Sequence, residues 1–343
     1  MTQREIEMKA TPEEKRKNNL IRRWKIIQGI RQYFLGQNFV EVETPYLVPS
    51  PGMEPHLSAL ELYCTHADGS RIKKYLHTSP EYGMKKLLGQ GWEKIFQVCR
   101  VFRDGEVSHT HQIEFTMLEW YRAHADYKKI MEDCEGLLRY LSEEVLGVQE
   151  LSYQARKINL SPSFERLRVA RAMSLYGGID VEKNCNSASL LEEARDRGYR
   201  FDPNETYSFD DVFFKIFLEA VEPRLGYPHP TLLHDYPASM AALARLKPRN
   251  PFWAERFELY IAGLELANAF SELNDPVEQR KRFAEEQRLR AKLGKPVYPI
   301  DEELIQALSR MPPSAGIALG VDRLVMLFCD ARTIQEVLAF PSI

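Results

Sequence analysis

The segment 114–121 carries the first residues whose types and spacing could do chemistry. If it forms a strand, one of its faces carries Phe115, Met117, Glu119 and Tyr121. A carboxylate on an ordinary core face is costly unless a cation pairs with it. This face therefore fits a nucleobase stacked on Phe115 and an ammonium group held by Glu119 and Tyr121. An internal salt bridge from Glu119 to an arginine fits the same pattern equally well.

Arg103 ends a strand predicted over residues 95–103, and a polar loop with Glu106, His109 and His111 follows it. A guanidinium at a strand end is well matched to a carboxylate or a phosphate, and such a loop can fold over a polyphosphate. Arginines at strand ends are common, so this signal is weak alone. We expect no metal site at His109 and His111, because no third ligand is in view.

Glu258 and Glu265 flank a predicted turn at residues 262–263. If that turn joins a hairpin, Tyr260 faces Glu265 and Glu258 lies diagonally on the same face. Two carboxylates on one face usually need a cation between them, and oxygen ligands with bound phosphates suit Mg²⁺. A pair of solvated carboxylates is the alternative.

In a regular strand, three further polar or aromatic residues would point to the face opposite Glu265. Asn268, Phe270 and Glu272 are opposite in parity to Glu265. All four can line one pocket only if a bulge intervenes near residues 267–269.

The segment 316–323 is predicted to run from a strand into a helix. Small residues at 316, 318 and 320 leave room for a ligand against the backbone, and Arg323 falls in the first helical turn, where anions are favoured. On this segment alone, close packing of strand on helix with Arg323 on the surface is the favoured interpretation.

The elements that position these residues follow one another as helix, strands, helical segment, strands and helix. A capping box at residues 11–14 predicts a helix that ends near Gly36, and a strand-like segment over 39–48 is interrupted by Pro45. The polar, mostly helical segment at about 152–229 is predicted to be an insertion between the halves of one sheet. The order is typical of an antiparallel α+β fold, and neither GxGxxG nor a P-loop is present.

The composition predicts a globular protein of a reducing compartment. The chain has 343 residues, is 44% hydrophobic and has a formal net charge of −3, which does not indicate a protein that wraps nucleic acid. Its five cysteines are widely spaced, without the spacing of zinc ligands. Because no segment is apolar for long enough to span a bilayer or to act as a signal, we expect a soluble, cytoplasmic protein with no membrane partner.

Several motifs resemble those of class II aminoacyl-tRNA synthetases. Phe102-Arg103 with 114–117 resembles motif 2, 320–323 resembles motif 3, and 36–45 resembles motif 1, which builds a homodimer interface in that class. The sequences of residues 80–81, 114–121 and 270–275 are similar to those of lysyl-tRNA synthetases. The resemblance runs from about residue 18. It implies a class II α+β catalytic core over 1–343, with an antiparallel sheet flanked by helices, that binds ATP and Mg²⁺.

The N-terminal part leaves no room for the anticodon-binding OB domain of bacterial lysyl-tRNA synthetases. The chain therefore resembles the truncated paralogue family, the elongation factor P–lysine ligases, most closely over 78–82, 117–122 and 315–320. This resemblance implies adenylation of lysine, preferentially (R)-β-lysine, and transfer to a lysine side chain of elongation factor P. It also implies that anticodon-dependent tRNA binding is absent.

The resemblance assigns a role to each candidate residue. Arg103 and Arg323 would be catalytic. ATP would be bound by Arg103, Glu106, His111, Phe115, Glu258 and Arg323, and Mg²⁺ by Glu258 and Glu265. The amino acid would be bound by Glu81, Glu119, Tyr121, Asn268, Glu272 and Ala318.

Two positions depart from the lysyl-tRNA synthetase pattern. Ala318 stands where those enzymes have glycine beside the amino acid, and its methyl group could favour a shifted amino group by about 1–3 kcal/mol. Gly105 stands where motif 2 has a glutamate, so Glu106 can serve only if the loop shifts. Two other functions remain open: a free-standing lysyl synthetase-like enzyme with another acceptor, and a non-catalytic paralogue that only binds amino acid.

Overall fold

The computed structural model describes residues 11–161 and 163–341. The first helix, α2 (Pro12–Gly36), begins with the predicted capping box, in which the Thr11 side chain accepts from the Glu14 amide and Glu14 reaches back to the Thr11 amide. Pro45 separates two short strands, as expected, β1 (Val40–Glu41) and β2 (Leu47–Val48). The helix and the broken strand that follows it are therefore confirmed.

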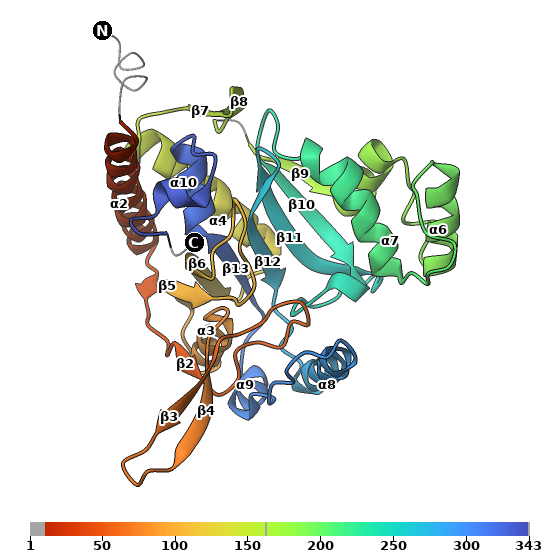
Figure 1. Cartoon of the computed structure of the whole chain (residues 1–343), viewed down its shortest axis with the longest axis horizontal. Coiled ribbons are helices and arrows are strands. Elements are labelled where there is room, and N and C mark those ends of the chain that lie inside the picture. Colours follow the sequence, from red (N-terminus) through yellow and green to blue (C-terminus); the bar gives the residue numbers. More distant parts are fainter. Residues whose placement is uncertain (1–10, 162, 342–343) are drawn as a thin grey trace.

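Eight strands form the central sheet, in the order β1-β5-β6-β13-β12-β11-β10-β9 (Figure 1). The strands other than β1 are β5 (Lys94–Phe102), β6 (Glu114–Ala123), β9 (Glu165–Arg168), β10 (Thr231–Pro237), β11 (Trp253–Ile261), β12 (Leu264–Ser271) and β13 (Ser314–Gly320). The pairs β1–β5 and β9–β10 at the two edges are parallel, and all other pairs are antiparallel. The predicted antiparallel α+β core is confirmed, with a parallel strand at each edge.

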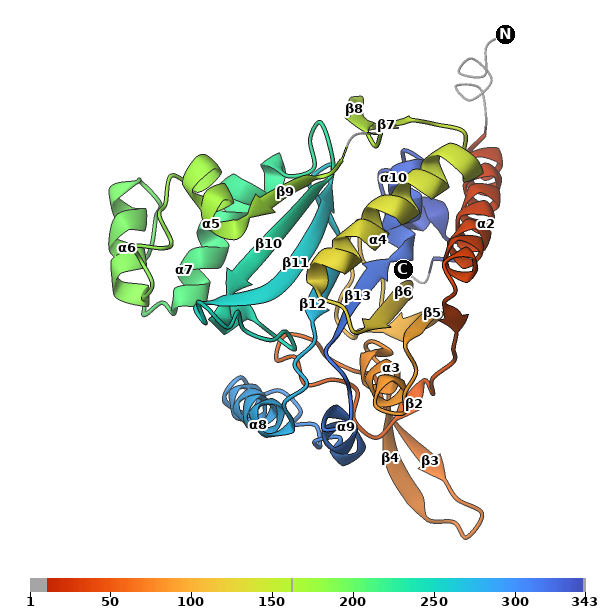
Figure 2. The same ribbon diagram turned by 180° about the vertical axis from the view of Figure 1, so that it is seen from behind.

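One face of the sheet is covered by helices. The core there joins α2, α4 (Tyr127–Tyr140) and α10 (Val321–Phe328) to the inward side chains of the central strands, among them Trp120, Phe257 and Ile317. Figure 2 shows α4 lying across this face. Because side chains alternate along a strand, the neighbouring residues of β6, β12 and β13 point to the opposite face.

The segment predicted as a helical insertion also contains strands. It holds α5 (Val169–Ala172), α6 (Ser187–Asp196) and α7 (Phe209–Ile216), together with the hairpin β7 (Glu150–Tyr153) and β8 (Arg156–Asn159). The sequence did not predict β9, which extends the sheet, nor β10 just beyond the segment. A separate apolar core packs the helices against β9, β10 and β11.

The remaining elements border the uncovered face. They are the hairpin β3 (Glu61–Thr65) and β4 (Arg71–Leu76), α3 (Glu81–Leu88), α8 (Pro276–Lys292) and α9 (Glu302–Leu308). Short π or 3-10 turns are η1 (Leu141–Val145), η2 (Met173–Gly177), η3 (Phe217–Val221), η4 (Glu222–Arg224), η5 (Ala238–Met240) and η6 (Ile334–Val337). No OB domain occurs within 11–161 and 163–341, and no helix there combines the length and apolarity of a membrane span.

The register of the central strands places the candidate residues on one face. On β13, Gly316 lies opposite Tyr121 and Ala318 opposite Glu119. On the other side of β13, Ala318 lies opposite Asn268. The alternation predicted for segment 114–121 is therefore confirmed.

The expected bulge in β12 exists, one residue before the predicted range. Tyr260 pairs with Glu265 and Leu259 with Ala267, so Leu266 has no partner on β11. This extra residue reverses the alternation and brings Glu265 to the same face as Asn268.

Candidate functional site

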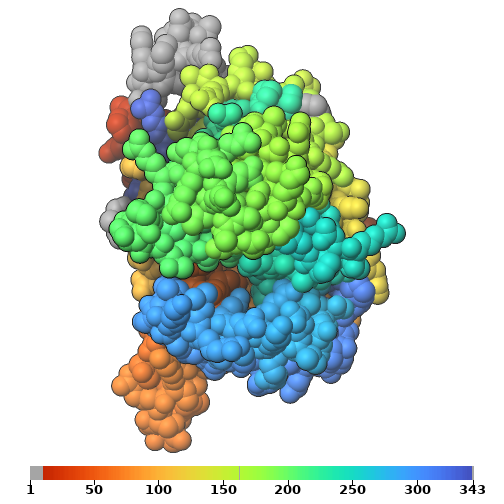
Figure 3. Space-filling view, turned by 90° about the vertical axis from the view of Figure 1, so that its right-hand side faces the viewer, coloured from red at the N-terminus to blue at the C-terminus, as the bar shows by residue number. Residues whose placement is uncertain are grey.

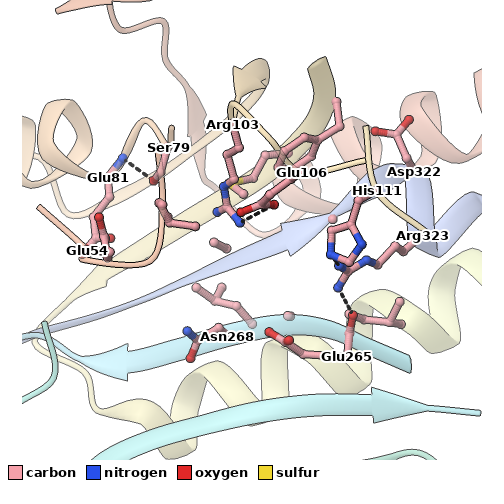
Figure 4. A pocket seen from close by; sticks show the side chains of 18 of the residues that line it. Glu54, Ser79, Glu81, Arg103, Glu106, His111, Glu265, Asn268, Asp322 and Arg323 are labelled. Carbon is pink, nitrogen blue, oxygen red and sulfur yellow. Dashed lines mark hydrogen bonds and ion pairs between the residues drawn. The ribbon is translucent and has the colours of Figure 1, made fainter. Parts of the chain in front are cut away.

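A cavity of about 280 Å³ opens on the uncovered face of the sheet (Figure 4). Eleven of the candidate residues line it: Glu81, Arg103, Glu106, His111, Phe115, Tyr121, Glu265, Asn268, Glu272, Ala318 and Arg323. Glu119 and Glu258 are buried and do not line it. In Figure 4, His111 and Arg323 lie at one end, the arginine end, and Glu54, Ser79 and Glu81 lie at the other, the acidic end.

Arg323 projects from the first turn of α10 and organises the arginine end. Its Nη1 donates to the Glu265 carbonyl oxygen over 2.7 Å, and its Nη2 binds the Nε2 of His111. Burial, with the charges of Arg323 and Arg103, lowers the pKa of His111 to about 4. The imidazole is therefore neutral, with Nε2 as acceptor and Nδ1–H donating to Ser108 Oγ over 2.7 Å. The surface position considered for Arg323 is wrong.

Arg103 lies between the two ends. Its guanidinium carbon is 5.3 Å from the centroid of the Phe115 ring, and its Nε donates to the Thr78 carbonyl oxygen over 3.3 Å. Its Nη1 is 3.9 Å from Glu106, which also lines the cavity. Gly105 has φ +77°, a conformation that suits glycine and lets the chain turn so that Glu106 faces inward. Glu106 therefore lines the cavity, as its expected role in binding ATP requires.

Glu258 and Glu265 lie on the adjacent strands β11 and β12. Glu258 is buried, not solvated, and accepts from Tyr236 over 2.5 Å, Tyr260 over 2.6 Å and Arg256 over 2.5 Å. The sequence missed Arg256, although it lies two residues before Glu258 on the same strand face.

The negative charge of Glu258 acts on Glu265. Burial, and then repulsion from Glu258, raise the pKa of Glu265 to about 7. Glu265 lines the cavity and suits Mg²⁺ that is also bound by phosphate oxygens, whereas Glu258 would join it only by releasing Arg256 or a tyrosine. Over 11–161 and 163–341 no cluster of three or more His, Cys, Asp or Glu could hold a metal ion without such help.

Glu119 lies fully buried behind the acidic end. One of its oxygens accepts from Ser79 Oγ over 2.5 Å and the other from the Tyr121 hydroxyl over 2.8 Å. Its partners are hydroxyls, so the internal arginine salt bridge is wrong. Burial, and then the charge of Glu81, raise the pKa of Glu119 to about 8.

Lys85 of α3 is a cation that the sequence analysis missed. Its ammonium lies 2.5 Å from Glu81 and 2.6 Å from Glu272, and its side chain is 1% exposed. The Glu81–Lys85 spacing of four residues on a helix was the available signal. Glu272 Oε1 remains buried without a hydrogen-bond partner.

Small residues of β13 form the cavity wall between these groups. A Cβ on Gly316 would lie 2.1 Å from a ring carbon of Tyr121 and 2.7 Å from Glu272 Oε1. Asn268, opposite Ala318, accepts from Arg256 Nε over 3.1 Å. Glycine at 316 is therefore required for the observed positions of Tyr121 and Glu272.

A buried ion pair connects the middle of α2 to α10 beside the site. Arg23 binds Asp322, whose other oxygen accepts from the Thr116 amide over 2.6 Å. Arg22 donates to the Phe328 carbonyl and Arg31 binds Glu41. Three basic residues of α2 thus have partners within the chain.

Comparisons with known proteins agree with this geometry. Residues 2–343 match the family model described as tRNA synthetases class II (D, K and N). The chain is 37% identical over 340 residues to the lysine–tRNA ligase of Carboxydothermus hydrogenoformans, covering 99% of this chain and 68% of that protein. It is 37% identical over 341 residues to the lysine–tRNA ligase of Moorella thermoacetica, with the same coverage, and 36% identical over 341 residues to that of Oceanobacillus iheyensis. The chain spans about two thirds of the length of these relatives.

Proposed function

Because the chain belongs to the family of class II tRNA synthetases (D, K and N), we propose that it uses ATP to activate lysine as an adenylate. In this reaction a carboxylate oxygen of lysine attacks the α-phosphorus of ATP, the bond to the β-phosphate bridging oxygen breaks, and pyrophosphate leaves. The products are lysyl-adenylate and pyrophosphate.

The acidic end is the observation that carries this proposal. Glu81 and Glu272 share the cation of Lys85, and the buried Glu119 beside them is bound by the hydroxyls of Ser79 and Tyr121. A buried set of negative charge without enough cations favours a ligand that brings its own. A diamino acid supplies two ammonium groups, and its carboxylate is complementary to Arg103.

The chain contributes positioning and charge, not a nucleophile. Phe115 and Arg323 would sandwich adenine between a ring and a guanidinium plane, and His111 would hold Arg323 in position. Arg103 lies between the ends, where carboxylate and α-phosphate would meet, and two reactants held there react as in an intramolecular step. Magnesium held by Glu258 and Glu265 would neutralise phosphate charge.

We assign transfer to a lysine side chain of elongation factor P, with (R)-β-lysine as the preferred amino acid. This proposal is supported by the resemblance of residues 78–82, 117–122 and 315–320 to the elongation factor P–lysine ligases. The methyl group of Ala318 in the cavity wall supports the preference for (R)-β-lysine. The ε-amine of the acceptor attacks the carbonyl of the adenylate and AMP leaves. The relatives are lysine–tRNA ligases, so tRNA is the competing acceptor.

Two measurements test the proposal. Pyrophosphate exchange is measured with lysine, (R)-β-lysine and (S)-β-lysine, with Glu265→Ala as the control expected to abolish it. Mass spectrometry then follows elongation factor P and tRNA in the same reaction. A mass increase of one lysyl group on elongation factor P supports the assignment, transfer to tRNA alone overturns the acceptor, and no exchange with any isomer favours a non-catalytic paralogue.

We also propose that the protein is a homodimer through α2 and β1. Apolar side chains there face solvent, with Trp24 60%, Leu35 55% and Val40 47% exposed. The chain has a mass of 39.8 kDa. Light scattering should give twice this mass, and Trp24→Glu should reduce the measured mass to that of the monomer. A monomer at micromolar concentration would contradict the dimer.

A further inference from the structure

Glu54 is a cavity-lining carboxylate to which the sequence analysis gave no role. It lies on the loop between β2 and β3, beside Glu81 at the acidic end (Figure 4). Its Oε2 is buried and has no hydrogen-bond partner. A buried, unpaired carboxylate oxygen costs free energy that a cationic ligand can recover.

The loop around Glu54 is held through its main chain, not through this carboxylate. Arg290 of α8 is fully buried and donates from Nη1 to the carbonyl oxygens of Glu54 and Leu57, both over 2.8 Å. Lys295 donates to the Pro55 carbonyl oxygen over 3.0 Å. The Glu54 side chain is therefore not needed to position the loop.

The backbone also makes room for the carboxylate. Gly52 has φ +124°, and a Cβ there would lie 2.7 Å from Glu54 Oε2 and 2.9 Å from Thr78 Oγ1. Any larger residue at 52 would displace the carboxylate from its place near Thr78. The loop thus fixes the Glu54 carboxylate next to the turn that leads into α3.

Few cations of the protein are available to Glu54. Burial raises the pKa of Glu54, the negative charge of Glu81 raises it further, and the cations of Arg103 and Lys85 lower it. Lys85 is already bound by Glu81 and Glu272. Arg103 is directed toward Glu106 and the centre of the cavity.

We propose that Glu54 determines substrate specificity by binding, with Glu81, the amino group nearest the reacting carboxylate of the diamino acid. The distal ammonium binds at the other carboxylates, Glu119 and Glu272, with Tyr121. This inference rests on the proposed function and deepens it. It gives each ammonium of the substrate its own carboxylate pair.

The test removes one charge from the protein and one amine from the ligand. Glu54→Gln is compared with the unchanged protein in pyrophosphate exchange with lysine or its preferred isomer. Norleucine, which lacks the distal amine, and 6-aminohexanoic acid, which lacks the proximal one, serve as competitive inhibitors. We expect the KM for the amino acid and the Ki for norleucine to rise about 10- to 100-fold, an effect typical of a lost charged contact. The Ki for 6-aminohexanoic acid and the KM for ATP should change less than about twofold.

Glu286→Gln is the matched control. Glu286 is on α8, its charge acts on the same region, and it does not line the cavity. The same substitution there should leave KM and both Ki values unchanged. Thermal denaturation of both variants checks that they fold.

The outcomes separate the two proposals. An active protein in which Glu54→Gln changes nothing, or changes both Ki values equally, overturns the role of Glu54 and leaves lysine activation standing. A protein with no exchange for any lysine isomer overturns both. Figure 3 shows the surface hollowed between α8 and the green and teal segments.

Discussion

Lys85 lies 2.6 Å from a carboxylate oxygen of Glu272, and each of these side chains is only 1% exposed. Burial alone would lower the pKa of Lys85, but the charges of Glu272 and Glu81 raise it above its ordinary value, so the lysine stays charged. The pair is thus a buried ion pair whose glutamate forms part of the cavity wall.

Lys85→Met should destabilise the protein by about 3–5 kcal/mol, because it leaves two buried carboxylates without their cation. Chemical denaturation measures this change. The double variant K85M/E272Q should recover a substantial part of the loss, since it removes one of the unpaired charges. Equal stabilities of the single and double variants would contradict the coupling.

Lysine binding should strengthen as pH rises from about 6 to 8, because an ammonium binds the ionised form of Glu119, whose pKa is raised to about 8. The gain is at most about tenfold per pH unit. Burial and Lys85 act in opposite directions on the neighbouring Glu272, whose pKa is raised to about 7, and it contributes over the same range. Titration calorimetry at several pH values measures the dependence.

Glu119→Gln is the control for this pH dependence. It should weaken binding and remove the part of the dependence near pH 8.

A raised carboxyl pKa in the folded state also means that the folded protein holds a proton that the unfolded chain loses. Stability contributed by Glu119 therefore falls as pH rises from about 4.5 to 8, and Glu119→Gln should raise the Tm relative to the unchanged protein most at pH 8. An unaltered Tm difference across this range would refute the pKa assignment.

Ala318→Gly should shift selectivity toward α-lysine by about tenfold, since one methyl group in the cavity wall is worth about 1–3 kcal/mol. The ratio of kcat/KM for α-lysine and (R)-β-lysine in pyrophosphate exchange measures it. Ala315→Gly removes a methyl group from the opposite face of the same strand, within the apolar core. It should lower stability without altering the ratio, and an equal shift in both variants would rule out a direct contact.

Gly316→Ala should lower the Tm by several degrees, because the new Cβ would meet the Tyr121 ring at 2.1 Å. Gly320→Ala adds the same atom at the end of the same strand, where the nearest atoms are 3.9 and 4.0 Å away. Its Tm should remain within about 2 °C of the unchanged protein. Differential scanning calorimetry of both variants makes the comparison, and similar losses would show that the strand tolerates no side chain at either place.

The sequence predicted those parts of the site that depend on local periodicity. Alternation along β6 placed Phe115 and Tyr121 on one face, and the capping box of α2 marked its first residue. The need for a bulge in β12 also followed from parity alone, although its position at Leu266 did not.

Contacts between residues of different helices, strands and loops could not be predicted from periodicity. Lys85 meets Glu272 across 187 positions of sequence only because α3 lies over the end of β12. Glu54 faces Glu81 because Arg290, on a distant helix, binds the loop backbone. Such contacts depend on how elements pack, and a single sequence contains no periodic signal for them.

The unpaired Leu266 makes the length of β12 as important as its composition. Deleting this one residue would restore an even pleat, and Glu265 and Asn268 would then be two positions apart and still on one face. Homologous chains can therefore carry either the bulge or a strand that is one residue shorter, but a strand of the same length without the bulge would turn Glu265 toward the helices on the far side.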